Sequence, residues 1–427
     1  MTDDEDRGVE DRRKELDAHW RAMPAQRLLD GGMVHGDVLR LEEATAALTP
    51  WDAAAEHLGE AQLDRGEDAS SAGHDRTAIE AYRAAVADFL FAQMPLPDGP
   101  RKTALYLRAR DALTAIAAIP GSGLSRVDVP FPAGAPDTGS DAAGSGSGSG
   151  AAGTDAGSLA SGIGSAGELV GWLLSPANPR ASVIVFGGQS GWGATYLRMA
   201  DALAARGIAT LMAEGPGQGE SRIVSGIHLD VDVAAAFSAF VDALLDRPEL
   251  AGRPVGIWGN SLGGTFAALT AVADHRITAT VVNGGFARPR LLPFHTFRAQ
   301  AAAMLGTADD AAIEANFARL AFDPATDRVA GGILVVHGGA DPIVDRADQT
   351  PFLAASADAT LLEWPHGDHT IYNDSEARTA AVADWLADRL IHRPTTDRST
   401  TAAADHPTAD HPTAAAASST SPPPHDP

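Results

Sequence analysis

Apolar residues recur at helical spacing over the first 120 residues of the chain. The clearest helix is predicted from Arg76 to Met94, where prolines end it. Its apolar face consists of Ile79, Tyr82, Val86, Phe89 and Leu90. A second helix is predicted from Arg101 to Ile119, and a weaker helical pattern covers Val38–Leu63. No strand pattern appears in this region, so residues 1–122 are expected to form a helical cap domain.

The pattern changes to strand-like alternation near residue 126. Val127, Val129 and Phe131 alternate along the chain, and Leu169–Leu174 is a second predicted strand. The stretch 132–166 between them is rich in Gly, Ser, Ala and Asp, which is typical of a flexible interdomain linker. The entropy of loop closure grows only with the logarithm of loop length. We therefore interpret this stretch as the lengthened tip of a β-hairpin.

From residue 181 onward, predicted strands and helices alternate. Strands are expected at 182–186, 208–213, 254–258, 277–282, 332–336 and 359–364, and helices at about 194–206, 229–246, 262–273, 346–356 and 375–391. This rhythm predicts an α/β domain over 123–392, with a mostly parallel sheet covered by helices on both faces. Several predicted helical segments in 284–328 interrupt the alternation of strands and helices and are expected to form a lid. Residues 393–427 have the composition of a disordered tail.

Composition limits the partners of the chain. The sequence has 56 acidic and 32 basic side chains and a formal charge of −24, which argues against nucleic acid or an anionic membrane as partner. Cysteine is absent, which excludes disulfides and thiolate chemistry. The acidic N-terminus does not look like a signal peptide, and no apolar run is long enough to span a membrane, so a cytoplasmic protein is expected. We predict no cofactor and no metal, and we interpret His406, His411 and His425 as parts of the tail.

The strongest chemical motif is a serine between glycines directly after an apolar run. Residues 256–264 read Gly-Ile-Trp-Gly-Asn-Ser-Leu-Gly-Gly, which is the G-x-S-x-G pattern centred on Ser261. Gly259 and Gly263 leave room for a tight strand-to-helix turn that exposes the hydroxyl group. The amide of Leu262 would then begin a helix and could stabilise an oxyanion. An incidental serine in such a turn is the alternative interpretation of the motif alone.

A nucleophilic serine needs a base and an acid that orients the base. Asp341 directly follows the apolar strand that ends at Val336, and Asp345 is its competitor. His369 follows the next predicted strand, and His366 is its competitor. The chain order Ser, Asp, His favours Asp341 and His369 as the partners of the serine.

The loop after the strand at 182–186 is expected to supply the second oxyanion donor. Its paired glycines allow close approach of the backbone, and the amide of Gln189 is the predicted donor. Trp192 and Glu214 are candidates for the substrate pocket. The alternatives are that Trp192 packs against the lid or the N-terminal helices, and that Glu214 belongs to a structural turn.

Several motifs together resemble one group of enzymes. They are Phe-Gly-Gly, Glu-Gly-Pro-Gly-Gln-Gly-Glu, Gly-Asn-Ser-Leu-Gly-Gly, His-Gly-Gly-Ala-Asp and Gly-Asp-His-Thr-Ile-Tyr-Asn. They are similar to motifs of the α/β-hydrolases related to 2,6-dihydroxypseudooxynicotine hydrolase, to FrsA-like esterases and to fungal polyketide-shortening hydrolases. The resemblance covers about residues 40–392. It implies an α/β-hydrolase fold behind a helical domain, a triad of Ser261, Asp341 and His369, an active site between the two domains, and a homodimer.

The resemblance also implies a reaction class. Several members of the group hydrolyse a carbon–carbon bond next to a ketone, in aromatic ketones or polyketide chains. We therefore expect a serine hydrolase that acts on a small carbonyl compound through an acyl-enzyme. Some relatives carry an extra acidic residue after the nucleophile, whereas Asn283 to Arg298 contains neither Asp nor Glu. A carboxylesterase, a thioesterase or an acyltransferase is the main alternative, and a non-catalytic scaffold that binds a small molecule is a lesser one.

Overall fold

A computed structural model describes residues 3–131, 167–189, 191–229, 232–293 and 295–392. All of them belong to one compact unit, Met1–Arg393. The predicted Gly/Ser insertion and the predicted tail, with its three histidines, lie outside the described residues. None of the helices in the described part of the chain combines the length and the apolar character that crossing a membrane requires.

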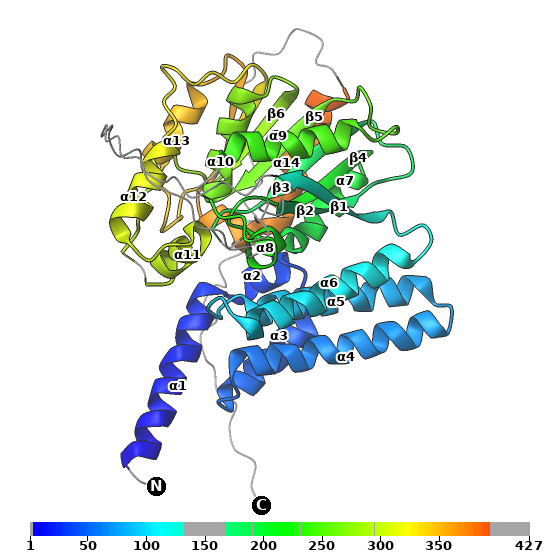
Figure 1. Ribbon diagram of the computed structural model, residues 1–427, viewed down its shortest axis with the longest axis vertical. Coiled ribbons are helices and arrows are strands. Elements are labelled where there is room, and N and C mark those ends of the chain that lie inside the picture. The colour runs from blue at the N-terminus through cyan, green and yellow to red at the C-terminus, as the bar shows by residue number, and fades with distance from the viewer. Residues whose placement is uncertain (1–2, 132–166, 190, 230–231, 294, 393–427) are drawn as a thin grey trace, which may run out of the picture. The chain divides into compact units, whose positions relative to one another are not determined.

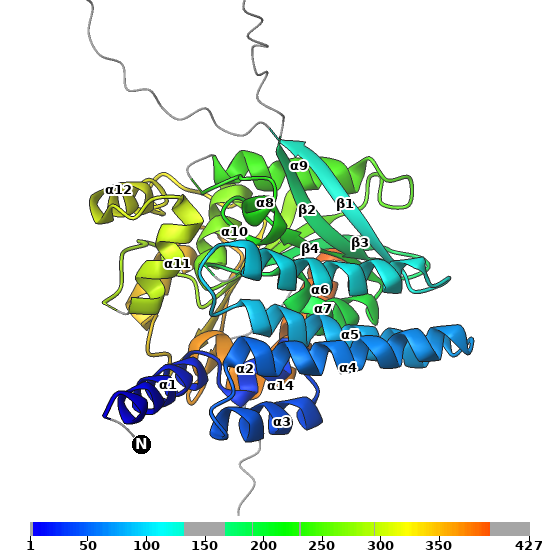
Figure 2. The same cartoon turned by 60° about the horizontal axis from the view of Figure 1, so that its bottom comes forward.

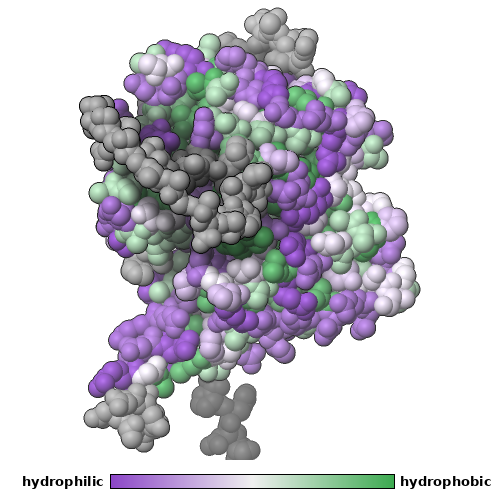
Figure 3. Space-filling view, in the orientation of Figure 1, coloured by the Kyte–Doolittle hydropathy of each residue, from purple (hydrophilic) through white to green (hydrophobic). Residues whose placement is uncertain are grey.

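In the described residues, six helices precede the first strand, in the region where the sequence predicts helices and no strand (Figure 1). They are α1 (Asp3–Ala22), α2 (Ala25–Asp30), α3 (His35–Ala46), α4 (Trp51–Ser71), α5 (Asp75–Gln93) and α6 (Pro100–Ala118). The single helix predicted over Val38–Leu63 is wrong, because the chain breaks between α3 and α4. Leu48 has a φ of 66° there, and Pro50 precedes the first residue of α4. Figure 3 shows that the surface of α1 is mainly hydrophilic.

The helices α4, α5 and α6 run side by side as a layer (Figure 2). Glycines on α4 allow its close approach to α5. A Cβ atom at Gly59 would lie 2.9 Å from the ring of Phe89, and one at Gly66 would lie 2.5 Å from the ring of Tyr82. Both distances are below van der Waals contact, so the two aromatic rings fill the space that missing side chains leave. The N-terminal helices are therefore closely packed, and their apolar cluster continues into residues of β2 and β4.

The strands form one eight-stranded sheet in the order β1-β2-β4-β3-β5-β6-β7-β8. They are β1 (Leu124–Phe131), β2 (Gly167–Leu174), β3 (Ala181–Phe186), β4 (Ile208–Glu214), β5 (Val255–Asn260), β6 (Ile277–Asn283), β7 (Gly332–Gly338) and β8 (Ala359–Trp364). The first two strands pair antiparallel from Leu124↔Leu174 to Phe131↔Gly167, which is the predicted hairpin. The strand β2 is antiparallel to β4, and all later pairs are parallel.

Side chains of the sheet alternate between two cores. Along β3, Ile184 and Phe186 pack with α9 (Val233–Leu245) and α10 (Leu262–Ala273). Val183 and Val185 point to the opposite face, where they pack with α7 (Leu197–Ala204) and α14 (Ser375–Leu390). A central parallel sheet buried on both faces is therefore confirmed. The segment predicted as a lid contains α11 (His295–Leu305) and α12 (Asp310–Arg319).

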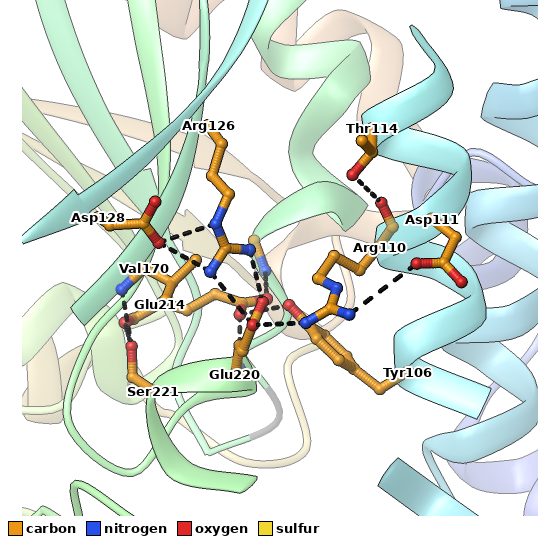
Figure 4. A network of polar contacts seen from close by, with 11 residues as sticks. Tyr106, Arg110, Asp111, Thr114, Arg126, Asp128, Val170, Glu214, Glu220 and Ser221 are labelled. Atoms are coloured by element: carbon orange, nitrogen blue, oxygen red, sulfur yellow. Dashed lines mark hydrogen bonds and ion pairs between the residues drawn. The ribbon is translucent and has the colours of Figure 1, made fainter. Parts of the chain in front are cut away.

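The N-terminal helices contact the sheet through both apolar and charged groups. Trp172 of β2 and Met212 of β4 are buried in the same cluster as the helices α4, α5 and α6. Glu220, in the short helix α8 (Gly219–Ile223), accepts hydrogen bonds from Arg110 of α6 and from Arg126 of β1 (Figure 4). The predicted boundary near residue 122 lies in the turn between α6 and β1.

Candidate active site

Ser261 occupies the sharp turn between β5 and α10. Its φ of 58° and ψ of −133° lie in a region that side chains other than glycine rarely adopt. A Cβ atom at Gly259 would collide with the backbone carbonyl of Gly263, and one at Gly263 would lie 2.5 Å from the carbonyl oxygen of Gly187. Neither position of the turn therefore has room for a side chain. The structure thus has the strained geometry that the G-x-S-x-G pattern predicts for an exposed nucleophile.

The predicted acid and base lie next to this serine. His369 Nε2 is 2.9 Å from Ser261 Oγ, and His369 Nδ1 is 2.9 Å from Asp341 Oδ2. The Asp341 side chain is 1% exposed and that of His369 is 16% exposed. The amides of Ile343 and Val344 donate to the other carboxylate oxygen of Asp341, at 2.8 and 3.1 Å. These bonds hold the carboxylate so that its free oxygen faces the imidazole.

The two competitors of these residues have other positions. Asp345 is the N-cap of α13 (Arg346–Leu353) and accepts a hydrogen bond from the amide of Asp348 at 2.9 Å. His366 is exposed, and its carbonyl accepts a hydrogen bond from the Asn373 side chain. Neither residue contacts Ser261. Asp341 and His369, the pair that chain order favours, are the two that connect to Ser261 by hydrogen-bond distances.

The backbone after His369 adopts a second unusual conformation. Thr370 and Ile371 both have a φ of 58°. The carbonyl of Thr370 accepts hydrogen bonds from Arg378 Nη1 at 2.8 Å and from Asn283 Nδ2 at 3.3 Å. Ile371 is fully buried against α14. These contacts hold the imidazole over the serine at the cost of backbone strain.

Two asparagines connect the strand ends beneath Ser261 and His369. Asn260 Nδ2 donates to the carbonyl of Phe186 at 3.1 Å, and Asn283 Nδ2 donates to Asn260 Oδ1 at 2.9 Å. They link the ends of β3, β5 and β6. Neither the two asparagines nor Arg378 was predicted from the sequence. The asparagines could have been found, because each directly ends an apolar strand at the edge where the predicted triad residues meet.

The predicted oxyanion donors lie in two segments that touch. A Cβ atom at Gly188 would be 2.7 Å from the amide nitrogen of Leu262. Leu262 begins α10, so its amide has no partner within the helix, and Gln189 follows Gly188 directly. Among the described residues, neither amide donates to a carbonyl or side chain. Both are available to a developing negative charge.

A cavity of about 120 Å³ contains Ser261 and His369. The helical region and the segment that leads into α3 contribute Arg27, Asp30, Gly31, Phe91 and Met94. The loop after β3 contributes Gly188, Gln189, Thr195 and Tyr196, and α11 contributes Phe297 and Gln300. Asn260, Ile343 and Tyr372 complete the lining. The cavity thus lies between the N-terminal helices, the carboxyl edge of the sheet and the predicted lid.

The two predicted pocket residues do not line this cavity. Trp192 is 3% exposed and packs in the helical core, with its ring 5.5 Å from that of Tyr106. This is the alternative that the sequence left open for Trp192. Glu214 is buried and accepts hydrogen bonds from Tyr106 Oη at 2.7 Å and from the amides of Gly193 and Glu220 (Figure 4). Burial raises the pKa of Glu214 to about 7, although these three donors oppose the shift.

Comparison with known proteins finds similarity to hydrolases. A family model described as serine aminopeptidase, S33, matches residues 177–328. The 2,6-dihydropseudooxynicotine hydrolase of Paenarthrobacter nicotinovorans is 27% identical over 218 residues, which is 50% of this chain and 59% of that protein. The alpha/beta hydrolase ucsC of an Acremonium species is 29% identical over 287 residues, which is 61% of this chain and 53% of that protein. The chain thus spans somewhat more than half the length of these curated relatives.

Solved structures extend the likeness in fold. The crystal structure of 2,6-dihydroxy-pseudo-oxynicotine hydrolase superimposes with a TM-score of 0.69 and 21% identity, and covers 86% of this chain and 96% of that one. AbyA5 superimposes with a TM-score of 0.52 and 18% identity, and covers 76% of this chain and 87% of that one. The chain has the fold of the α/β-hydrolases. Among proteins of this fold it is similar to 2,6-dihydroxypseudooxynicotine hydrolase in both sequence and structure.

Proposed function

We propose that the chain is a serine hydrolase that acts on a small carbonyl compound. The observation that carries this proposal is the chain of contacts from Ser261 through His369 to Asp341, both at 2.9 Å. In this mechanism His369 Nε2 takes the proton of Ser261 Oγ as the oxygen attacks the carbonyl carbon. The buried carboxylate of Asp341 stabilises the imidazolium ion. The amides of Gln189 and Leu262 stabilise the oxyanion.

The collapse of the tetrahedral intermediate decides which bond breaks. We favour hydrolysis of a carbon–carbon bond in a β-diketone or aromatic ketone. There the carbon–carbon bond breaks to give an enolate, which takes the proton of His369 on carbon and departs as a ketone. Water then hydrolyses the acyl-enzyme, which releases a carboxylic acid and restores Ser261. The likeness to 2,6-dihydropseudooxynicotine hydrolase supports this choice, as does a cavity lined in part by residues of the N-terminal helices. Ester or thioester hydrolysis is the second candidate, because Asn283–Arg298 lacks the acidic residue of some relatives.

A paired substrate assay tests the proposal. Purified protein is given a β-diketone with an aryl group and, separately, a short nitrophenyl ester, with Ser261→Ala as the control. We expect turnover of the diketone to a carboxylic acid and a ketone, and loss of turnover in the variant. Turnover of the ester alone would support the second candidate. No turnover of either, or equal turnover by Ser261→Ala, would overturn the serine hydrolase.

A further inference from the structure

The Glu-Gly-Pro-Gly-Gln-Gly-Glu motif after β4 contains a buried amide side chain that touches the predicted oxyanion loop. Gln218 is 1% exposed. Its Oε1 atom accepts a hydrogen bond from the amide of Gly215 at 3.0 Å. Its Nε2 atom donates to the carbonyls of Gly187 at 2.5 Å and Gly188 at 2.9 Å. Every polar atom of this side chain is therefore used, and both donor bonds go to the loop that follows β3.

The bond to Gly188 has a consequence for the next residue. The carbonyl of Gly188 and the amide of Gln189 belong to the same planar trans peptide, in which C=O and N–H point in opposite directions. The carbonyl of Gly188 accepts two hydrogen bonds, one from Gln218 Nε2 and one from the amide of Gly191 at 3.1 Å. The amide of Gln189 must therefore point away from them. Gln189 lines the cavity that contains Ser261.

We propose that Gln218 is a positioning residue that fixes the amide of Gln189 as an oxyanion donor. This proposal rests on the proposed serine hydrolase. The strand order supports it, because β4 is the direct neighbour of β3 and their carboxyl ends lie side by side. Gly191 leaves the room that Gln218 needs, since a Cβ atom there would lie 2.7 Å from Nε2.

Glu214 fixes the same loop at a second point. Its carboxylate accepts from the amide of Gly193 at 2.8 Å, at the end of the oxyanion loop, and from the amide of Glu220 at 2.6 Å, at the end of the motif. The motif thus fastens the loop at both ends, through Gln218 near Gly188 and through Glu214 at Gly193. This explains chemically why an acidic and an amide side chain stand four residues apart in the motif.

Two variants of Gln218 test the proposal. Gln218→Met keeps the length of the side chain but removes both donor bonds. We expect kcat for the preferred substrate to fall about 10- to 100-fold, with KM within about twofold, because removal of one whole oxyanion donor costs about 10²–10³ in kcat. Affinity for a trifluoromethyl ketone, which forms an oxyanion on serine, should fall by a similar factor. A structural role alone would not produce this parallel loss.

Gln218→Glu provides a second readout. A carboxylate at this position would face two carbonyls without a proton to donate. The activity of the Gln218→Glu variant relative to the wild type should therefore be low at pH 8. On acidification, the protonated carboxyl regains one donor, so the same ratio should rise as pH falls. A ratio that does not change with pH would contradict the proposal. The ratio cancels any pH dependence that both proteins share.

Gln349→Met is the matched control. Gln349 is also fully buried, and its Nε2 atom donates to the carbonyl of Val336 at 3.3 Å, away from the oxyanion loop. We expect kcat of this variant within about threefold of the wild type. Equal loss of kcat in both methionine variants, or no loss in Gln218→Met, would overturn the positioning role of Gln218 but not the proposed function. An inactive wild type would instead overturn the proposed function, and this inference with it.

Discussion

The N-terminal helices and the carboxyl edge of the sheet are built on different principles. The helices are held by close apolar packing, with Gly59 against Phe89 and Gly66 against Tyr82. The sheet edge is held by buried polar contacts around strained backbone at Ser261 and Thr370. Packing tolerates many apolar side chains, whereas each polar contact at the edge has one donor and one acceptor. Substitutions should therefore reduce activity at the edge and stability in the helices.

The largest effect is expected for the acid of the triad. In Asp341→Asn, the side chain can no longer stabilise the imidazolium ion, and kcat should fall about 10⁴-fold. Asp345→Asn is the control, because Asp345 caps α13 and does not contact His369. Its kcat should stay within about threefold. Steady-state kinetics on the preferred substrate measures both variants, and comparable losses in the two would contradict the assignment of Asp341.

The ion pair that joins the two regions should come next. Arg378 Nη2 donates to Asp30 of α2 at 2.8 Å, with side chains 0% and 9% exposed, and Arg378 also holds the carbonyl of Thr370. Asp30→Asn leaves the buried guanidinium without its counter-charge. The free energy of unfolding should fall by about 3–5 kcal/mol, and kcat should fall as well.

A second ion pair between the same regions provides the comparison. Arg83 and Asp201 also join the N-terminal helices to the α/β region, at 2.7 Å, but their side chains are 29% and 47% exposed. Asp201→Asn should cost at most about 1 kcal/mol, because solvent screens the pair. Chemical denaturation measures both variants. Equal losses in the free energy of unfolding for Asp30→Asn and Asp201→Asn would mean that burial does not strengthen the contribution of the Asp30–Arg378 ion pair.

Glu214 of β4 is bonded to Tyr106 of the N-terminal helices, and its ionisation makes the stability of the protein depend on pH. Its pKa in the folded protein is raised to about 7, from a usual value of 4.5. Between pH 4.5 and 7, Glu214 is therefore protonated in the folded protein and ionised in the unfolded protein. This difference stabilises the fold, with the full contribution to the free energy of unfolding below pH 4.5, and the contribution is lost as pH rises through 7. The shift corresponds to about 3 kcal/mol.

Glu214→Gln removes this titration and places an amide nitrogen against a backbone N–H group. We expect the wild type to be more stable than the variant at pH 5, with a difference that shrinks toward pH 8. Urea unfolding of both proteins at several pH values gives this difference. A difference that grows with pH would show that Glu214 is held as a carboxylate throughout.

The smallest effect concerns packing within the helices alone. Gly59→Ala places a methyl group against the ring of Phe89 and should cost about 1–3 kcal/mol of stability without a change in kcat. Gly36→Ala is the control, because the nearest atom to a Cβ there is the end of Arg40, at 3.8 Å. It should leave stability unchanged or slightly raised. Loss of kcat in Gly59→Ala with unchanged stability would contradict the separation of the two regions.

The same contrast explains which features the sequence could predict. Ser261, Asp341 and His369 each follow their own strand, and parallel strands bring their carboxyl ends to one edge. The strand pattern, the G-x-S-x-G motif and the chain order Ser, Asp, His together predicted that these residues would meet. The strand pattern also predicted the hairpin across the insertion. Helical periodicity did not predict the break between α3 and α4, because Leu48 is a residue that rarely adopts positive φ.

The cavity lining was not predictable in the same way. Arg27 and Asp30 lie in a six-residue helix, which is too short to show a periodic pattern. Trp192 was a candidate for the pocket because it follows the oxyanion loop, but its indole ring packs into the helical core instead. Such choices depend on how the helices dock on the sheet. Local sequence does not encode this docking, since it depends on contacts between residues far apart in the chain.

The most direct test of the account is covalent labelling of Ser261. The protein is treated with a fluorophosphonate, digested and mapped by mass spectrometry, beside Ser261→Ala and His369→Ala. We predict one adduct, on the peptide that contains Ser261, with no adduct in Ser261→Ala and strongly slowed labelling in His369→Ala. No adduct on the wild type, or an equal adduct on Ser261→Ala, would contradict the assignment of Ser261 as the nucleophile.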